Sequence, residues 1–340
     1  MALIEHQIWR HFMQALRLIS PALDASQVRV GDVPVPIAGE GEVLIEVAFA
    51  GLNFSDVMAR RGDPGYAASY PFIPGLEIAG IVREVADGAQ LAPGDRVAAF
   101  VPGGGLAELA VASAALTVRV PPEVPLDLAA TAPLMLSTAI LLLEDVGRIR
   151  PGESLLMHSA GGGLGSSVSQ VAAFLHAGVK VGTVGREDKI AAARNAGWDH
   201  VVVRDGNWPL KVQQLLPDGV ELVLDPTGTD NLDHDARLVA AGGRMVLFGN
   251  PGGGDLSPLP GLRTLMAGNI GILGFSIRRL SADKPTRVAA ALARALDLLA
   301  SGAIRPEVTV IDGLVNVAAV HNLLASGRGV GKYVAAVTPE

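Results

Sequence analysis

The sequence predicts an α/β protein in which a doubly wound parallel sheet is inserted into a β-rich, barrel-like domain. In the first third, short apolar or alternating runs are separated by Gly and Pro turns, a pattern typical of a barrel. In the middle third, strand-like runs alternate with helical stretches, which indicates a parallel sheet. Too little chain remains after that for another domain, so we expect the chain to return to the first one.

Hydrophobic periodicity and turn residues place the individual elements. Strands of the first third are expected at 14–19, 27–33, 42–50, 78–85 and 96–100. The middle third is expected to hold strands at 154–158, 180–184, 201–203, 221–225, 244–248 and 270–275, and helices at 164–177, 187–196, 209–216 and 231–240. Asp230 is the expected N-cap of the last of these helices. The final part should contain helices at 285–301 and 316–325 and strands at 307–311 and 333–337.

These elements imply three segments. Residues 1–12 are interpreted as an N-terminal extension, 13–137 together with 278–340 as the β-rich domain, and 138–277 as the α/β domain. The cleft between the two domains should lie at the carboxyl ends of the parallel strands, where such sheets bind ligands.

Composition excludes several classes of protein. Of the 340 residues, 49% are hydrophobic and 18% charged, which suits a large core and excludes disorder as the main state. The net charge of −7 argues against nucleic acid as a partner. The absence of cysteine excludes thiolate nucleophiles and Cys-ligated metals and fits a reducing compartment, so we expect a cytoplasmic protein.

Neither a membrane span nor a secretory signal is expected from the sequence. The longest charge-free apolar run, 128–143, contains Pro133 and is too short to span easily, so we interpret it as a buried segment. Residues 1–12 lack a basic stretch followed by an apolar core.

A glycine-rich turn joins the first strand of the middle third to an apolar-periodic helix. In this context the match to G-x-G-x-x-G is meaningful, with Ala160, Gly162 and Gly165 at its first, third and sixth positions. Gly162 would let the backbone approach a pyrophosphate, and Gly165 would let the helix pack on the strand. Gly163 and Leu164 lie where the helix N-terminus would face the phosphates. We therefore predict a Rossmann dinucleotide-binding domain, with a plain tight turn as the alternative.

The end of the next strand indicates which dinucleotide binds. NAD-selective folds usually carry an acid there for the ribose 2′-hydroxyl, whereas this chain has Gly185 and Arg186. Lys189 lies one helical turn further on, and Arg204 follows the third strand. A charge-assisted bond to a 2′-phosphate is worth about 1.5–3 kcal/mol, enough for roughly tenfold preference. We predict NADPH as the cofactor; the alternative for each cation is a solvated surface position.

The glycine loop and several other segments resemble the medium-chain dehydrogenase/reductase superfamily, and within it the zinc-free quinone oxidoreductase branch that includes zeta-crystallin. The resemblance covers nearly the whole chain from Met13. The matching segments are AGLNFSDVMARRG (50–62), PFIPGLEIAGIV (71–82), PGDRV (93–97), GGGLAELAV (103–111), RPGESLLMHSAGGGLGSSVSQVA (150–172), AAGGRMVLFGN (240–250) and GKYV (331–334).

The resemblance implies a GroES-like catalytic domain built from both chain ends, with the Rossmann domain between them. It also implies a homodimer joined through the strand at 269–275, and hydride transfer from NADPH to a quinone or an α,β-unsaturated carbonyl compound.

No metal site is expected. Zinc members of the superfamily use a Cys in the region that here reads Gly51-Leu52-Asn53, and a His in the segment that here reads Gly75-Leu76-Glu77. Glu77 alone cannot hold zinc, which takes about four ligands. His158, beside the glycine loop, is interpreted as structural.

The resemblance also implies roles near the reacting atoms. Conjugate reduction needs orientation and a hydrogen bond to the developing oxyanion, and no ionised nucleophile. Asn53 is expected to hydrogen-bond near the nicotinamide or the substrate, its alternative being a turn residue that satisfies its own backbone. Asp56 would orient this loop or cap a helix. Thr138 resembles a threonine near the nicotinamide.

Further contacts are implied on the two sides of the cleft. Phe248, Gly249 and Asn250 are expected to touch the nicotinamide ribose or amide. Lys332 is expected to reach the cofactor edge, its alternative being a solvent-facing strand start.

The substrate side is less defined. Some relatives place a tyrosine where this chain has Met58; Tyr66 or Tyr70 would then take its place, which leaves the proton donor open. Two other functions fit the sequence. A trans-acting enoyl-thioester reductase of a biosynthetic pathway would use a basic patch, for which Arg60 and Arg61 are candidates. A non-catalytic NADPH-binding protein would favour changes at Asn53 or Thr138, and both residues are present.

Overall fold

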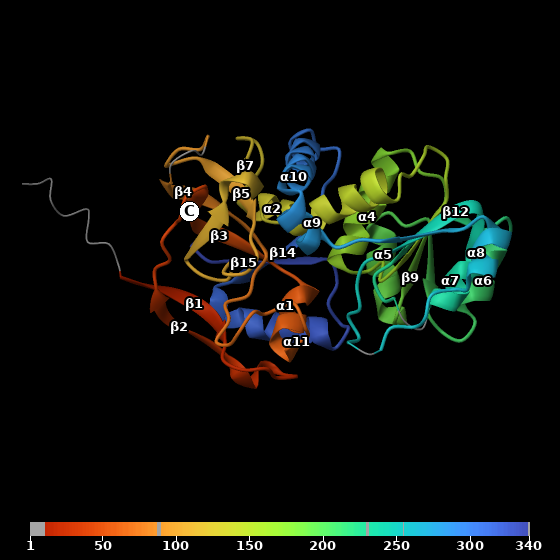
Figure 1. The fold of residues 1–340 in the computed structure, drawn as a ribbon, viewed down its shortest axis with the longest axis horizontal. Helices are drawn as coiled ribbons and strands as arrows, with labels where there is room; N and C mark the ends of the chain where they lie inside the picture. Colours follow the sequence, from red (N-terminus) through yellow and green to blue (C-terminus); the bar gives the residue numbers. More distant parts are fainter. Residues whose placement is uncertain (1–10, 87–89, 229–230, 254, 339–340) are drawn as a thin grey trace, which may run out of the picture.

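The structure is a computed structural model that describes residues 11–86, 90–228, 231–253 and 255–338. Two lobes lie side by side, one built from the early strands of the chain and the other from the parallel sheet with its helices (Figure 1). Helices α9 (Ile277–Asp283) and α10 (Pro285–Ala300) run over the junction between the lobes (Figure 1).

The first lobe contains a seven-stranded sheet in the order β14-β15-β3-β4-β5-β7, with β6 paired to β3. Its strands are β3 (Glu42–Leu52), β4 (Glu77–Val85), β5 (Arg96–Phe100), β6 (Leu109–Ser113), β7 (Thr117–Arg119), β14 (Val308–Asp312) and β15 (Lys332–Ala336). A separate antiparallel pair joins β1 (Phe12–Leu18) to β2 (Val28–Pro34). Helices α1 (Phe54–Arg61) and α11 (Val317–Ala325) pack against each other in this lobe.

Both ends of the chain contribute to this one sheet. β15 pairs antiparallel with β3, so that Tyr333 lies opposite Leu52, and β14 pairs parallel with β15. The α/β segment is therefore inserted between two parts of the same lobe. The boundaries proposed at 137/138 and 277/278 stay predictions, and residues 1–10 of the expected extension lie outside the described residues.

The second lobe is a six-stranded parallel sheet in the order β10-β9-β8-β11-β12-β13. Its strands are β8 (Leu155–His158), β9 (Lys180–Val184), β10 (His200–Val203), β11 (Val220–Asp225), β12 (Val239–Leu247) and β13 (Gly271–Gly274). The associated helices are α4 (Gly163–Phe174), α5 (Ile190–Asn195), α6 (Trp208–Leu215), α7 (Leu232–Leu238) and α8 (Leu262–Gly268). The predicted fold class, a Rossmann sheet inserted in a GroES-like domain, is confirmed.

The structure corrects two of the predicted elements. The helix expected at 231–240 ends at Leu238, and β12 begins directly at Val239, five residues before the predicted strand start at 244. The cause is local: Gly242 has φ +83° and the pairing with β11 shifts register there, which breaks the regular strand pattern in the sequence. Asp230, the expected cap, lies outside the described residues, and Asn231 occupies the N-cap position.

The apolar run at 128–143 is buried, as predicted. It lies within a continuous helical segment formed by α2 (Leu126–Ala129), η3 (Ala132–Leu136), α3 (Ser137–Ile140) and η4 (Leu141–Val146). This is the one helix among the described residues that is long and apolar enough to cross a membrane, but 83% of its apolar window is buried inside the protein. Its side chains join those of both lobes in a single hydrophobic core, which holds the lobes against each other.

Candidate cofactor and active site

The glycine-rich turn has the packing that a dinucleotide fingerprint requires. A Cβ atom at Gly165 would lie 2.5 Å from the carbonyl oxygen of Ala160, so only glycine lets α4 approach β8 this closely. At Gly162 the nearest protein atom to an added Cβ would be 3.5 Å away. The protein's own packing therefore does not demand glycine there, and the backbone face is open to a ligand. Gly163 and the half-buried Leu164 form the first turn of α4, whose N–H groups point out of the helix end.

The C-terminal segment lies directly against this turn. The N–H of Gly331 donates to the carbonyl oxygen of Gly161 at 3.1 Å, and Gly331 forms an isolated parallel bridge with Gly162. Lys332, the next residue, begins β15 of the first lobe. The two lobes therefore meet at the glycine loop.

A buried ion pair lies at this junction. Lys332 is 3% exposed and Glu77 fully buried, and the Lys332 Nζ donates to Glu77 Oε1, to Asn53 Oδ1 at 2.8 Å and to the Leu52 carbonyl oxygen at 3.0 Å. An ammonium group has three donors, and all three are used inside the protein. The alternative of a solvent-facing strand start is therefore wrong, because Lys332 is buried. The contact between Lys332 and the cofactor edge stays a prediction, and the ammonium group has no donor left over for it.

Glu77 is the centre of the same network. Its Oε2 accepts hydrogen bonds from the backbone N–H groups of Leu134 (2.8 Å) and Met135 (3.1 Å), which belong to the buried helical segment. Sequence reasoning excluded Glu77 as a sufficient zinc ligand and assigned it no role. The available signal was a lone acid in an apolar strand together with a lone lysine in the last strand, but nothing local connected them.

Asn53 belongs to this network as well. Its Nδ2 donates to Glu77 Oε1 at 2.9 Å and to the Gly51 carbonyl oxygen at 3.1 Å, so both amide hydrogens are engaged with protein atoms. This arrangement leaves Asn53 no free donor for a substrate oxyanion. Its observed contacts are those of a positioning residue at the start of α1, and any direct contact with nicotinamide or substrate stays a prediction.

Asp56 has the role that the sequence suggested. It is buried and accepts hydrogen bonds from the N–H of Asn53 at 2.8 Å and of Gly75 at 3.1 Å, which ties the start of α1 to the loop before β4. Burial raises the pKa of Asp56 to about 6, against the opposing effect of these two hydrogen bonds.

The positions at which the resemblance implies zinc ligands in related proteins do not fit a metal here. Leu76 is an apolar, buried residue at the histidine position, and both oxygens of Glu77 are engaged, one of them by the Lys332 ammonium. Elsewhere, His158, Asp225 and Asp235 bring their ligand atoms within 4.8 Å of one another. They are already bonded within the protein: His158 Nε2 lies 2.9 Å from Asp235 Oδ1, and Asp225 accepts from the backbone of Thr227 and Gly228. This agrees with a structural role for His158.

Thr138 lies in α3 with its Oγ1 buried. Within the described part of the chain, this oxygen has no hydrogen-bond partner. A buried hydroxyl without a partner costs about 1–3 kcal/mol, so a polar ligand group would be favoured there. The observation suits the predicted position near a nicotinamide.

Three cations converge at the ends of β9 and β10. Arg186 is exposed, and Lys189 and Arg204 are half-buried. Burial lowers the pKa of Lys189, and repulsion by Arg186 and Arg204 lowers it further. Arg204 lies beside Gly185, where an added Cβ would be 3.5 Å from the guanidinium. Like charges held together in this way favour an anionic ligand.

The three cations are not equally available to such a ligand. Arg186 pairs with Asp188 at 2.7 Å, which already balances its charge. Lys189 and Arg204 form no ion pair with a described residue within 4.0 Å, although Asp225 and Asp235 attract Arg204 over a longer range. Lys189 and Arg204 are therefore more available to an anionic ligand than Arg186.

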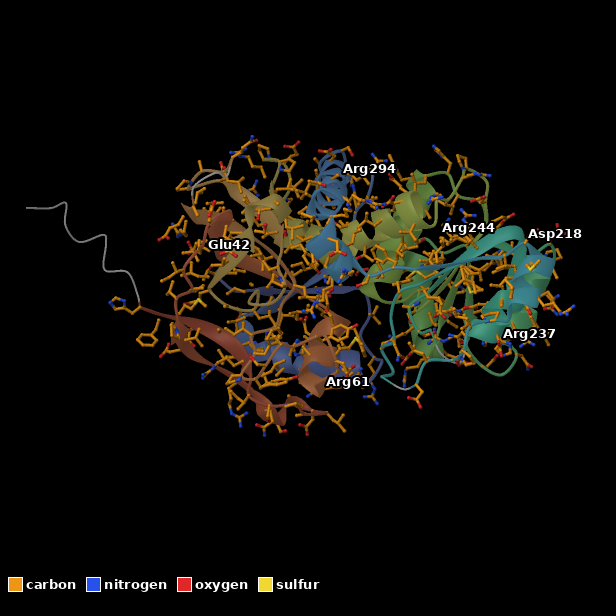
Figure 2. All side chains as sticks on the ribbon, viewed as in Figure 1. Glu42, Arg61, Asp218, Arg237, Arg244 and Arg294 are labelled. Atoms are coloured by element: carbon orange, nitrogen blue, oxygen red, sulfur yellow. The ribbon has the colours of Figure 1, made fainter. Side chains whose placement is uncertain are left out.

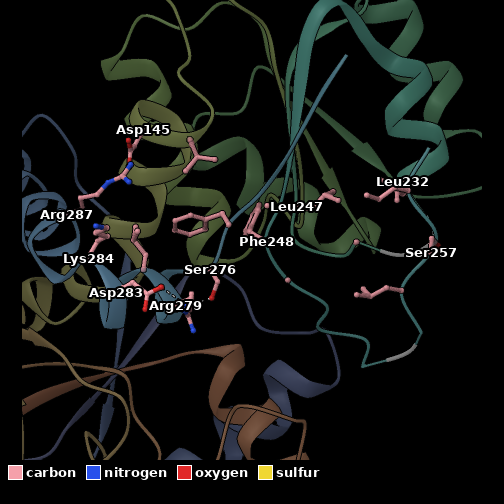
Figure 3. A pocket seen from close by; sticks show the side chains of 18 residues that line it. Asp145, Leu232, Leu247, Phe248, Ser257, Ser276, Arg279, Asp283, Lys284 and Arg287 are labelled. Atoms are coloured by element: carbon pink, nitrogen blue, oxygen red, sulfur yellow. Dashed lines mark hydrogen bonds and ion pairs between the residues drawn. The ribbon is translucent and has the colours of Figure 1, made fainter. Parts of the chain in front are cut away.

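A cavity of about 820 Å³ opens at the carboxyl ends of β12 and β13 (Figure 3). Phe248 and Gly249 line it, as does Phe275, and charged side chains from α9 and α10, such as Arg279 and Arg287, lie around it. Asn250 follows in the adjoining loop, where its carbonyl oxygen accepts from the N–H of Gly253. Among the predicted site residues, the structure brings Phe248 and Gly249 to this cavity, whereas Asn53, Thr138 and the glycine loop are not part of its lining.

The predicted substrate residues have different surroundings. Met58 is buried in α1, at 8% exposure. Tyr70 donates its hydroxyl to the carbonyl oxygen of Ala59 and is therefore engaged. Tyr66 is half-buried, and its ring lies 5.8 Å from the guanidinium carbon of Arg278 in α9. Burial raises the pKa of Tyr66, so its hydroxyl stays protonated near neutral pH.

Arginines tie the loops of the two lobes together near this region. Arg278 donates to the carbonyl oxygen of Pro102 at 2.9 Å. Arg61, labelled on α1 in Figure 2, donates to the carbonyl oxygen of Pro251 at 2.8 Å. The loop after β12 is thus held to the first lobe by a side chain that sequence reasoning considered only as part of a basic patch.

Comparison with known proteins agrees with this architecture. Two family models match the chain: the alcohol dehydrogenase GroES-like domain over residues 39–122, and the zinc-binding dehydrogenase family over residues 163–296. Quinone oxidoreductase-like protein 2 of Rattus norvegicus is 30% identical over 301 residues, covering 87% of this chain and 85% of that protein.

Solved structures give the same result. A mycobacterial protein complexed with NADPH superimposes with a TM-score of 0.86 at 29% identity, covering 95% of this chain and 99% of that one. A quinone oxidoreductase of Pseudomonas syringae pv. Tomato DC3000 gives a TM-score of 0.86 at 26% identity, with the same coverage. The chain spans only 66% of the synaptic vesicle membrane protein VAT-1 homolog of Danio rerio and 54% of the VAT-1 homolog-like protein of Mus musculus.

Proposed function

This chain belongs to the quinone oxidoreductase-like branch of the medium-chain dehydrogenase/reductase superfamily, and from that premise we propose that it is a zinc-independent, NADPH-dependent reductase of quinones or α,β-unsaturated carbonyl compounds. The observation that carries the proposal is the convergence of Arg186, Lys189 and Arg204 beside a glycine loop with an open backbone face. The mycobacterial relative complexed with NADPH supports the same cofactor.

The residues that would hold NADPH follow from the site. The N-terminal N–H groups of α4, with Gly162 before them, would bind the pyrophosphate. Lys189 and Arg204 would bind the 2′-phosphate by charge-assisted hydrogen bonds. The buried Thr138 hydroxyl would form a hydrogen bond with the nicotinamide end of the cofactor. When bound, NADPH supplies a hydride to an electron-poor carbon.

The protein's part in the reaction is to orient the substrate relative to the cofactor and to exclude water from the site. The Lys332–Glu77–Asn53 network would hold the start of α1 against the glycine loop, so that the substrate-side residues keep a fixed distance from the cofactor site. Tyr66, protonated at neutral pH, is a candidate proton donor on the loop after α1. A quinone can take its proton from solvent, so the proposal needs no dedicated acid.

Zinc independence is part of the proposal. It rests on Leu76 in place of a ligand and on the ammonium of Lys332 at Glu77, which would repel a dication. Enzyme that has been treated with a chelator and then dialysed should keep its full activity, and added zinc should not raise it.

The decisive experiment is NADPH consumption by the pure, chelator-treated protein against simple quinones, small enones and one enoyl thioester, with NADH run in parallel. Turnover of quinones or enones with NADPH preferred supports the proposal. Turnover of the thioester alone would replace it with enoyl-thioester reduction. Measurable NADPH binding without turnover of any compound would favour a non-catalytic NADPH-binding role.

We also propose a homodimer through the predicted strand at 269–275. Its observed core, β13, is an edge strand of the parallel sheet, and Leu256, Leu259, Leu262 and Met266, in the segment that precedes it, are each more than 60% exposed. Light scattering of the wild type and of a Met266→Lys variant would test this; a monomeric wild type would contradict it. A cytoplasmic location is likewise proposed, and cell fractionation tests it.

A further inference from the structure

A chain of buried polar side chains connects α7 to the predicted 2′-phosphate site. Asp235, His158 and Thr183 are each fully buried. His158 Nε2 lies 2.9 Å from Asp235 Oδ1, and His158 Nδ1 lies 2.7 Å from Thr183 Oγ1. Thr183 Oγ1 in turn accepts a hydrogen bond from Arg204 NH1 at 3.3 Å. These contacts join the ends of β8, β9 and β10 to α7.

The charges at the two ends set the direction of these hydrogen bonds. Arg204 can only donate, and a carboxylate at Asp235 can only accept. Neutral His158 then carries its proton on Nε2, toward Asp235, and leaves Nδ1 as an acceptor. With Nδ1 as an acceptor, the Thr183 hydroxyl donates its hydrogen to Nδ1, while the hydroxyl oxygen accepts from Arg204. Each of these hydrogen bonds thus joins one donor to one acceptor.

The imidazole of His158 is also fixed in orientation. The ring of Trp208 meets it edge-on, with ring centroids 5.1 Å apart and an interplanar angle of 86°. Asp225 is the other carboxylate that faces this cluster, and it accepts from the backbone N–H groups of Thr227 and Gly228. Neither of these neighbours offers His158 Nδ1 an alternative donor, which leaves Thr183 as its partner.

Arg204 is the one member of this chain of side chains that is accessible. It is half-buried and lies beside Gly185 and in the electrostatic field of Lys189. A long, flexible guanidinium side chain at such a site loses conformational entropy when it binds an anion. A hydrogen bond that already holds it in place reduces that cost.

We propose that Asp235, His158 and Thr183 form a buried hydrogen-bond relay that positions Arg204 for the 2′-phosphate of NADPH, and so contributes to selection of NADPH over NADH. The inference rests on the proposed NADPH dependence. The three relay members are positioning residues, because none of them faces the cofactor site directly.

The first test is made on the wild-type protein and uses a variant only to assign the signal. Nitrogen-15 NMR of the histidine side chains in the wild-type protein, with His158 assigned by comparison with His158→Gln, reports which ring nitrogen carries the proton. The relay requires the Nε2–H tautomer, protonated toward Asp235. An Nδ1–H tautomer, or a doubly protonated ring at pH 7, would overturn the proposed direction of the bonds and with it the relay.

The second test is a double-mutant cycle on cofactor affinity. Thr183→Val removes the hydroxyl while keeping the shape of the side chain, and we expect it to weaken NADPH binding about three- to tenfold and leave NADH binding within about twofold. Thr183→Ser, which keeps the hydroxyl, should restore NADPH affinity. Thr117→Val, a buried strand threonine of the other lobe, is the matched control and should change neither affinity.

The cycle closes with Arg204→Gln. If Thr183 acts through Arg204, adding Thr183→Val to Arg204→Gln should cause no further loss of NADPH affinity. An equal loss in both backgrounds, or an equal loss for NADPH and NADH, would show a merely structural role and overturn the inference. A wild type that binds the two cofactors equally would instead contradict the proposed function, and the tautomer measurement still decides whether the relay exists.

Discussion

The buried ion pair at the junction of the lobes gives the sharpest test of the structural reasoning. Lys332→Met removes the ammonium while keeping a side chain of similar length. It leaves the fully buried Glu77 carboxylate without its counter-charge, and Leu52 and Asn53 without a donor. Removing one partner of a buried ion pair typically costs about 3–5 kcal/mol of unfolding free energy.

The surroundings of Glu77 determine where in that range the loss of unfolding free energy should fall. Its carboxylate keeps three hydrogen bonds in the variant, from the backbone of Leu134 and Met135 and from the Asn53 amide. Because these donors compensate part of the charge, we expect a loss of about 3 kcal/mol, toward the lower end. Urea denaturation at pH 7, followed by circular dichroism, measures it.

The matched control is the double variant Glu77→Gln with Lys332→Met, which removes both charges and keeps the carbonyl acceptor for the Leu134 and Met135 N–H groups. It should recover most of the lost stability, since no buried charge remains unpaired. A single variant that loses less than about 1 kcal/mol, or a double variant as unstable as the single one, would refute the assigned pairing.

Three further predictions concern single side chains. Arg186→Ala should weaken NADPH binding more than NADH binding, but by only about threefold, because Asp188 already pairs with this arginine. Fluorescence titration with both cofactors measures the two affinities, and equal losses for NADPH and NADH would contradict the prediction. Burial lowers the pKa of His321 to about 3. Below pH 6.5 this histidine therefore binds a proton in the unfolded chain, whereas it stays neutral in the folded chain until the pH approaches 3. Unfolding free energy should therefore fall by about 2 kcal/mol between pH 7 and pH 5, and His321→Leu should lack this part of the fall in urea denaturation. The raised pKa of Asp56, about 6, has the opposite sign, because the folded chain keeps a proton that the unfolded chain releases. Stability should therefore fall by about 2 kcal/mol as pH rises from 4 to 7, and Asp56→Asn should remove this slope.

Local patterns in the sequence were sufficient to predict an element where that element has a clear hydrophobic pattern of its own. The strands that became β5, β8, β9 and β11 were predicted to within one residue at each end, because buried strands of this kind are short apolar runs bounded by turn residues. The glycine loop was predicted with its packing role, since Gly165 must lie against Ala160 for α4 to follow β8. Short elements whose patterns carry little periodicity, such as α1 and β7, were not predicted.

The sequence by itself therefore determined the fold class, the position of the dinucleotide turn and the cations that surround the predicted 2′-phosphate site. Only the tertiary structure decided which polar groups meet. Lys332 and Glu77 are separated by 255 residues and His158 and Asp235 by 77, and no periodicity relates such partners. Their pairing follows from the sheet, which brings distant strand ends together. Burial then makes each charge depend on its partner, because an isolated buried charge is too costly to keep.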